Sequence, residues 1–343
     1  MTGPCAVEYT PWRKEDAMND ATQTTDTTPK APVIVSFGGG VDSTAILVEM
    51  ARRGEHPDLI LFADVGAEAP ETYAHIERFS DWLESQGMPR VTVVSRPKNI
   101  RMRASTPYTT ITGNCVANET LPSEAFGRGA CSMKWKHEPM EAFLKGRRGQ
   151  PGWLERNGWK PEHGKPVRVI GYDATESCSG KRGKWAKVTE DDHWAYRYPL
   201  VTWGWTRERC IEEIEKAGVP APPKSACTFC PNQQPEELYA LALNHPKLFL
   251  EALAIEANAK IGKHGLTRLE GLWRKTRKRD NRSGSWVIWA RDNGLLEAAE
   301  EHTGERLMNV VKRMRADVGL EMPGLTPEHM TMTFFGQQVR IAV

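Results

Sequence analysis

The 343-residue chain lacks long hydrophobic runs, a strong excess of either charge, and internal repeats. Its longest apolar runs, such as residues 59–63, are far shorter than the roughly 20 residues that a membrane helix needs. Lysine and arginine (46) nearly balance aspartate and glutamate (44), so the net charge of +2 does not by itself indicate a nucleic-acid or membrane partner. No apolar signal core follows the first basic residues. We therefore expect a soluble, cytoplasmic protein with no membrane partner.

Cysteine occurs seven times, but without the spacing of a small secreted disulfide framework. Cys227 and Cys230 form a C-x-x-C pair, which favours metal ligands or catalytic thiols. No cysteine follows Cys230. Cys5, Cys115 and Cys178 belong to no motif, and we assign them no function.

Short apolar runs alternate with helical patterns in the first part of the chain. The expected strands are residues 32–35, 59–62, 91–94 and 167–171, and the expected helices between the first three strands are residues 43–50 and 70–85. Strands that are almost continuously apolar and alternate with helices are typical of a parallel sheet covered on both faces. The pattern predicts an α/β fold with an open parallel sheet and helices on both faces.

The two ends of the chain differ from this pattern. Residues 1–30 are rich in Thr, Asp and Ala and predict a flexible N-terminal segment. From Pro235 onward the pattern is mainly helical, over residues 236–243, 246–259, 295–301 and 305–318. We therefore expect a nucleotide-binding domain over 31–235 and a mainly α-helical C-terminal region over 236–343.

The most specific motif joins the first strand to the first helix. It contains three glycines followed by an acid and two hydroxyls: Gly38, Gly39, Gly40, Asp42, Ser43 and Thr44. Glycines let backbone N–H groups approach an anion, and the helix N-terminus adds partial positive charge. An acid in such a loop suggests a Mg²⁺ ion between the carboxylate and a pyrophosphate. The alternative is a tight turn in which the glycines serve packing alone.

No Gly-Lys-Ser/Thr of a Walker loop follows these glycines, and the G-x-G-x-x-G spacing is absent. The loop resembles the pyrophosphate loop (PP-loop) of the adenine-nucleotide α-hydrolase superfamily, Ser-Gly-Gly-x-Asp-Ser. Gly38 replaces the leading serine, and Ser36 stands two residues earlier. The resemblance implies a Rossmann-like fold of the HUP type that binds ATP, or phosphoadenosine phosphosulfate (PAPS), with Mg²⁺.

Two further segments are similar to parts of the PAPS reductase family. Residues 61–72, with Asp64 at the end of the second strand, resemble a motif that lies beside the adenosine in that family. Asp173 and Glu176 follow the fourth strand, where the family has an acid near the nucleotide. The resemblance implies that these acids bind the nucleotide or its metal; a turn or helix-capping role is the alternative for each.

The cysteine segments resemble PAPS reductase-like proteins that are often found in phages and mobile elements. A cysteine with a nearby lysine precedes a proline, here Cys131, Lys134 and Pro139, and a later Pro-x-Lys-Ser-x-Cys-x-x-Cys-Pro contains Cys227 and Cys230. Iron–sulfur members have adjacent cysteines at the first position, but Ala130 stands there in this chain. Cys210 is therefore expected to supply the fourth ligand, with packing as its alternative role. Four thiolates suit a [4Fe–4S] cluster, or alternatively zinc.

Residues 274–282 form a basic stretch near Trp273, Trp286 and Trp289. Positive charge beside aromatic rings suits a nucleic-acid backbone with exposed bases, and a solvated loop is the alternative. Arg128 and Lys134 are further cations that suit a phosphate or sulfate, with solvated surface charge as the alternative.

The resemblance implies an enzyme that cleaves ATP at the α-phosphate to AMP and pyrophosphate, with Asp42 and Lys134 as catalytic residues. Sulfur transfer or nucleic-acid modification is the expected setting, as in DNA phosphorothioation proteins, and a sulfur donor protein is a possible partner. A true PAPS reductase that releases sulfite is one alternative, although such enzymes use a cysteine near their C-terminus. A non-catalytic nucleotide- or nucleic-acid-binding module is the other.

Overall fold

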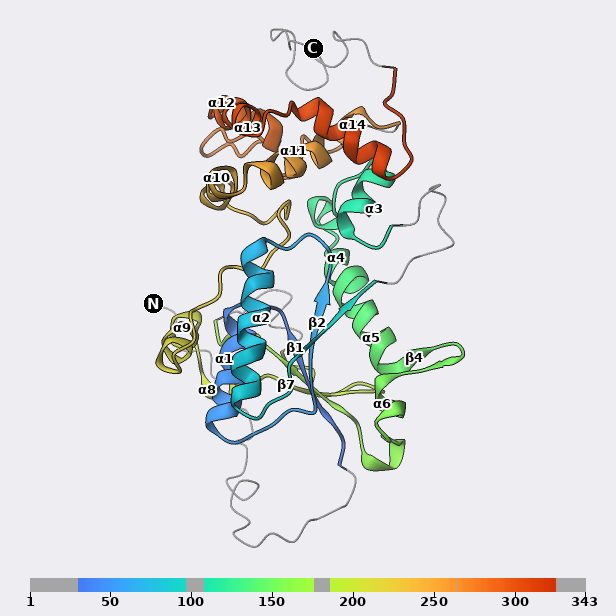
Figure 1. Ribbon diagram of the computed structural model, residues 1–343, viewed down its shortest axis with the longest axis vertical. Helices are drawn as coiled ribbons and strands as arrows, with labels where there is room; N and C mark the ends of the chain where they lie inside the picture. Colours follow the sequence, from blue (N-terminus) through green and yellow to red (C-terminus); the bar gives the residue numbers. More distant parts are fainter. Residues whose placement is uncertain (1–29, 97–107, 176–185, 264, 325–343) are drawn as a thin grey trace, which may run out of the picture. The chain divides into compact units, whose positions relative to one another are not determined.

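The computed structural model describes residues 30–96, 108–175, 186–263 and 265–324, which form two compact units (Figure 1). Unit 1 contains the described residues within Met1–Ala63, Pro70–Val94 and Met140–Ser225. Unit 2 contains those within Asp64–Ala69, Ser95–Pro139 and Ala226–Val343. This division differs from the expected boundary at residue 235, because residues from 65–67 and 108–135 share a hydrophobic core with the C-terminal helices.

The sheet is an open five-stranded parallel sheet with the order β3-β2-β1-β6-β7. Its strands are β1 (Val33–Phe37), β2 (Leu59–Asp64), β3 (Val91–Ser95), β6 (Val167–Ile170) and β7 (Ala195–Arg197). In the middle of the sheet, Val35 pairs with Ile60 of β2 and Val169 of β6. The predicted fold class is confirmed, and the sheet is consistent with HUP-like folds.

Both faces of this sheet are buried, because alternate residues of each central strand enter different cores. In β2, Ile60 and Phe62 join one core, whereas Leu59 and Leu61 join the other. The first core contains residues of α1 (Val41–Arg52), α2 (Pro70–Ser85), α8 (Pro199–Trp203) and α9 (Arg207–Lys216). The second contains residues of α5 (Glu138–Lys145) and α6 (Trp153–Arg156), which lie on the opposite face (Figure 1). This double burial explains why the strands are almost continuously apolar.

Unit 2 is built around α11 (Pro246–Ile261), which is buried along most of its length. A helix that is apolar on nearly all sides belongs in the centre of a bundle. The helices around it are α3 (Ile111–Ala117), α10 (Pro235–Asn244), α12 (Trp286–Asp292), α13 (Leu295–Thr303) and α14 (Leu307–Asp317). The C-terminal helices were predicted except α12, whose seven residues are too few for a clear period.

The remaining elements are short. They are η2 (Ser123–Phe126), α4 (Ala130–Ser132), the π-helical turn η3 (Met133–His137), η4 (Pro161–His163), and the antiparallel strands β4 (Gly146–Arg147) and β5 (Gln150–Pro151). Strand β7 was also not predicted, since it has only three residues. Among the residues that the structure describes, no helix is both long and apolar enough to cross a membrane.

Candidate functional site

The three-glycine loop leaves the carboxyl end of β1 and leads directly into α1, as the sequence predicts. Gly39 has a φ of +72°, which L-residues rarely adopt, and a Cβ atom there would lie 3.1 Å from Cγ2 of Thr72. Gly40 is the N-cap of α1, and no side chain caps the helix. The loop therefore needs glycine for its conformation and its packing, and the helix begins without a competing side-chain acceptor.

The two hydroxyls of the motif form hydrogen bonds within the loop. Ser43 Oγ accepts from the Gly38 N–H (3.1 Å) and donates to the Gly40 carbonyl (3.3 Å). Thr44 Oγ1 also donates to that carbonyl (2.9 Å) and lies 3.1 Å from Nε2 of His75. Both hydroxyls are buried, so in this structure they hold the loop in shape. Ser36, the other hydroxyl near the loop, is half-buried within β1.

His75 supports the loop from α2. Because the Thr44 hydroxyl donates to Gly40, it accepts from the Nε2–H of a neutral His75 ring. The ring stacks on Phe79 at a centroid distance of 5.4 Å. Burial, with a smaller contribution from Arg78, lowers the pKa of His75 to about 4. The imidazole is therefore neutral at physiological pH, and its Nε2–H tautomer can form this hydrogen bond.

Asp42 lies in the first turn of α1 with its side chain mostly buried, and Arg207 of α9 lies beside it. Arg207 Nη1 is 3.6 Å from Asp42 Oδ1. Ser225 approaches the same loop, since its Oγ donates to the Gly38 carbonyl (2.7 Å). A carboxylate, an exposed guanidinium and a glycine loop are the groups needed to bind a metal-complexed polyphosphate.

Cys210 lies in unit 1, whereas Cys115, Cys131, Cys227 and Cys230 lie in unit 2. Cys210 is fully buried in the core that α9 shares with α1. Burial, with the charges of Asp42 and Asp173, raises the pKa of its thiol to about 12. The thiol is packed in the core of unit 1, and its role as a metal ligand remains a prediction.

The other predicted nucleotide ligands are Asp173, Asp64 and Glu176, and they do not all belong to the same unit as the loop. Asp173 is buried after β6, at the edge of the sheet where the loop lies. Asp64 belongs to unit 2, and its Oδ1 accepts from the Gly66 N–H (2.7 Å), which is a turn-forming contact. Glu176 lies outside the described residues, as do Cys5 and Cys178.

The C-x-x-C pair lies in a turn of unit 2 that pairs with residues 67–68. Cys227 forms a β-bridge with Glu68, and the Thr228 N–H donates to the Ala67 carbonyl (2.8 Å). Lys136 Nζ lies 3.1 Å from Glu68 Oε1. Burial lowers the pKa of Lys136, but the Glu68 carboxylate and the neighbouring Cys227 outweigh this effect and raise the pKa.

The thiols of unit 2 interact with one another. Burial raises the pKa of Cys227, and Glu68, Cys230 and Cys131 add to the effect while Lys136 opposes it. Burial also raises the pKa of Cys115, to which Cys131 adds. Cys115, which the sequence analysis assigns no function, is thus near Cys131.

Three of the four predicted metal ligands, Cys131, Cys227 and Cys230, therefore belong to unit 2, and Cys210 belongs to the core of unit 1. Among the described residues, no three or more His, Cys, Asp or Glu side chains are arranged to hold a metal ion. The iron–sulfur or zinc centre on Cys131, Cys210, Cys227 and Cys230 remains a prediction.

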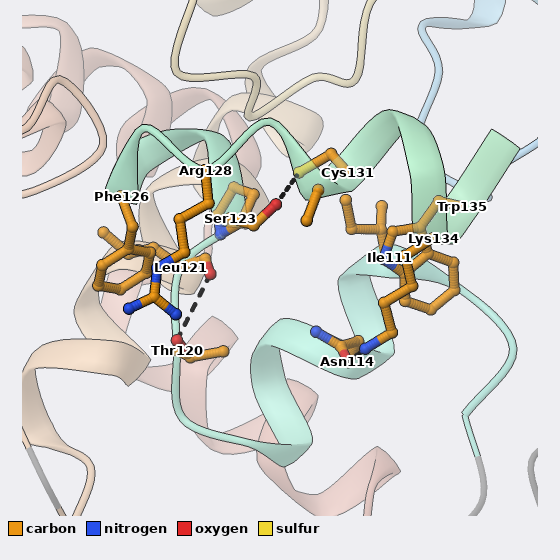
Figure 2. A pocket seen from close by; sticks show the side chains of 12 residues that line it. Ile111, Asn114, Thr120, Leu121, Ser123, Phe126, Arg128, Cys131, Lys134 and Trp135 are labelled. Atoms are coloured by element: carbon orange, nitrogen blue, oxygen red, sulfur yellow. Dashed lines mark hydrogen bonds between the residues drawn. The ribbon is translucent and has the colours of Figure 1, made fainter. Parts of the chain in front are cut away.

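Lys134 and Cys131 line a pocket of unit 2 (Figure 2). Lys134 Nζ donates to Asn114 Oδ1 (3.2 Å) and lies 5.6 Å from the centre of the Trp135 ring. Cys131 Sγ is 3.1 Å from Ser123 Oγ. This lysine therefore belongs to the pocket, whereas Lys136 is the cation beside the C-x-x-C pair.

The basic stretch 274–282, here named the basic loop, is exposed at most of its positions. The three nearby tryptophans, however, are buried and pack edge to face in the core. They do not form the stacking surface that the sequence suggested, because their rings fill the helical core. Within the loop, Arg277 pairs with Asp280, and Arg282 lies 4.1 Å from the centre of the Trp273 ring.

The chain matches no protein-family model, and no curated protein is similar enough to count as a relative. The family resemblance thus depends on the motifs and the fold alone. Arg207, His75 and Lys136 were missed as site residues, because each is distant in sequence from the group that it contacts. Lys136 alone had a sequence signal, namely its position two residues after Lys134 in the cysteine segment.

Proposed function

We propose that this chain is a PP-loop enzyme, similar to the PAPS reductase family, that binds an adenine nucleotide on residues 38–44. The observation that supports this proposal best is the loop itself. A buried parallel strand ends in three glycines, one with positive φ, and Asp42 stands in the first turn of an uncapped helix. Such a helix N-terminus binds phosphate through its N–H groups and its partial positive charge.

We propose ATP as the nucleotide and cleavage at its α-phosphate as the reaction. An oxygen nucleophile forms a new bond to the α-phosphorus, and pyrophosphate leaves with the electron pair of the broken bond. With water as the final acceptor the products are AMP and pyrophosphate. Asp42 would hold a Mg²⁺ ion that offsets the charge of the pyrophosphate, and Arg207 supplies a second positive charge.

The contacts of the loop residues indicate which of them would bind phosphate and which hold the loop in shape. Ser43 and Thr44 fix the shape of residues 38–40, and His75 fixes Thr44. The phosphates would bind to the N–H groups at the start of α1. Preorganisation of this kind lowers the barrier because the dipoles need no rearrangement during the reaction. The C-x-x-C pair of unit 2 supports sulfur transfer or nucleic-acid modification as the setting of this chemistry.

The test is to incubate the full chain anaerobically with Mg²⁺ and either ATP or PAPS, and to separate the products. We expect AMP and pyrophosphate from ATP, and a loss of roughly 100-fold or more in Asp42→Ala. Asp81→Ala is the matched control, since Asp81 is an exposed aspartate of α2 in the same unit. Equal turnover in both variants, or release of ADP in place of AMP, would contradict the proposal. In a parallel incubation with a thiol, which supplies the two electrons and becomes a disulfide, release of sulfite from PAPS would favour the reductase.

A further inference from the structure

Unit 2 contains a pocket of about 400 Å³ that the proposed nucleotide loop leaves without a function (Figure 2). This volume is in the usual range for small-molecule sites. The wall comes from α3, the turn at 120–122, η2, and the segment that includes α4 and η3. None of the lining residues that the structure describes is acidic, whereas Arg128 and Lys134 are cationic. The charge of the pocket therefore favours an anionic ligand.

The pocket also presents an aromatic ring. Phe126 lines it at the end of η2, and 39% of its surface is exposed, which is unusual for a phenylalanine in a folded unit. Figure 2 shows the Arg128 side chain directed toward the same side of the pocket as the Phe126 ring. A ring next to a guanidinium suits a ligand with a planar ring and a phosphate, which is the composition of a nucleotide.

The basic loop begins at the wall of this pocket. Arg274 Nε donates to the Ala125 carbonyl (2.6 Å) within η2. The guanidinium of Arg274 also occupies the space where a Cβ atom of residue 127 would lie, so Gly127 is needed for this contact. From Arg274 the chain continues through the exposed Lys275, Lys278 and Arg279. The positive charge thus extends beyond what one phosphate requires.

We propose that this pocket binds one nucleotide of a single-stranded nucleic acid. The base stacks on Phe126, and the adjacent phosphate contacts Arg128 and Lys134. The flanking strand follows the basic loop, where exposed cations replace the counterions of successive phosphates. The base does not stack on Trp273, Trp286 or Trp289, because these rings are buried. The sequence pattern, in contrast, suggested that the bases stack on them. The binding of the strand does not depend on the proposed function.

The test is fluorescence anisotropy of a labelled single-stranded 12-residue oligonucleotide with the full chain, without ATP. We expect Phe126→Ala to weaken binding by about 10-fold or more, because one base–aromatic stack is lost. Phe126→Trp should retain binding, since it keeps the ring. Arg128→Gln should lower the slope of log affinity against log salt by about 0.7, the value for one single-strand phosphate contact.

Tyr239→Ala is the matched control for the aromatic change. Tyr239 is an exposed aromatic residue of the same unit, at 37% exposure, and it does not line the pocket. Unchanged binding in Phe126→Ala, or an equal loss in Tyr239→Ala, would overturn the inference. Full displacement of the oligonucleotide by an equal concentration of AMP would also overturn it, because the site would then be one for free nucleotides.

The outcomes of this test and of the ATP test are independent. A chain that cleaves ATP but binds no strand would refute the pocket and leave the enzyme proposal intact. A chain that binds the strand through Phe126 but cleaves no ATP would support the pocket and refute the enzyme proposal.

Discussion

Each of the two units contains a fully buried glutamate on a helix, and the two are neutralised in different ways. Glu49 of α1 is paired with Arg52 and Arg53, which are both partly exposed to solvent. Glu256 of α11 accepts from three backbone N–H groups, at residues 272, 286 and 287, and from Ser285. Lys260, itself almost fully buried, lies 3.1 Å from the Glu256 carboxylate.

This difference shows what each glutamate does in its unit. Glu49 near the end of α1 holds two arginines that are partly exposed at the surface. Glu256 fixes both ends of the segment that contains the basic loop, because its partners precede and follow residues 274–282. The basic loop is therefore anchored at its base while its charged tip is exposed.

Among substitutions that distinguish the two glutamates, Glu256→Gln is expected to have the largest effect on stability. The amide removes the charge that Lys260 neutralises and turns an NH₂ toward backbone donors, so we expect a loss of about 3 kcal/mol in unfolding free energy. Glu49→Gln should cost about 1 kcal/mol, because its arginines can return to solvent. Denaturant unfolding of both variants measures the difference. Equal losses would mean that the two carboxylates are equivalent.

A smaller effect is expected when a methyl group is added to the loop of unit 1. Gly39→Ala should weaken ATP binding at least 10-fold, because the new Cβ would meet Thr72 and the φ of +72° becomes strained. Gly54→Ala is the control: its φ is +69°, but nothing lies within 4 Å of the added Cβ. Both variants should lose about 1 kcal/mol in stability. Titration calorimetry with ATP should show weaker binding in Gly39→Ala alone; a similar weakening in both would contradict the close packing of the loop.

Because His75 is buried as a neutral ring, the unfolding free energy should depend on pH. Its folded pKa of about 4 lies below the unfolded value of 6.5, so the unfolded chain takes up a proton first as the pH falls. Stability is therefore full above pH 6.5 and is lost toward pH 4, by roughly 2 kcal/mol. His75→Gln, which keeps an N–H donor, should remove this part of the pH dependence. An identical pH profile in the variant would contradict the assignment.

The smallest effect is expected for Cys210. Any iron or zinc that the purified chain holds should be lost in Cys227→Ser but retained in Cys210→Ser, because the Cys210 thiol is buried in the core of unit 1. Elemental analysis of anaerobically purified protein measures both. Cys115→Ser is the informative third variant, since Cys115 interacts with Cys131 in unit 2. Metal loss in Cys210→Ser would restore the original ligand set.

Much of unit 1 was predictable from the sequence, because its signals are local. The apolar run of β1, the glycines and the first turn of α1 are contiguous, and the chain geometry alone brings Gly38 and Asp42 to one edge of the sheet. Asp64 shows the limit of this reasoning: its place at the end of β2 was predicted, but its carboxylate closes a turn with Gly66.

Unit 2 was less predictable, because residues distant in the sequence meet there. A tryptophan near a basic stretch can be exposed or buried, and its sequence context does not distinguish the two. In the folded chain these tryptophans pack in the core. Lys136 and Glu68 are 68 positions apart, so no spacing rule connects them. Cys210 was predicted as the fourth ligand because Ala130 replaces a cysteine of the family motif, and this argument contains no information on which core the Cys210 thiol enters.

The parallel sheet, the glycine loop and the helical C-terminal region follow from local patterns, since hydrophobic period and glycine conformation act over a few residues. The assignment of Cys210 and the other described cysteines to different units, the pairing of Arg207 with Asp42, and the contact of Arg274 with Ala125 beside the pocket come from the packing of the folded chain. These pairings depend on burial and charge between segments tens of residues apart, where one sequence permits many combinations and packing selects one.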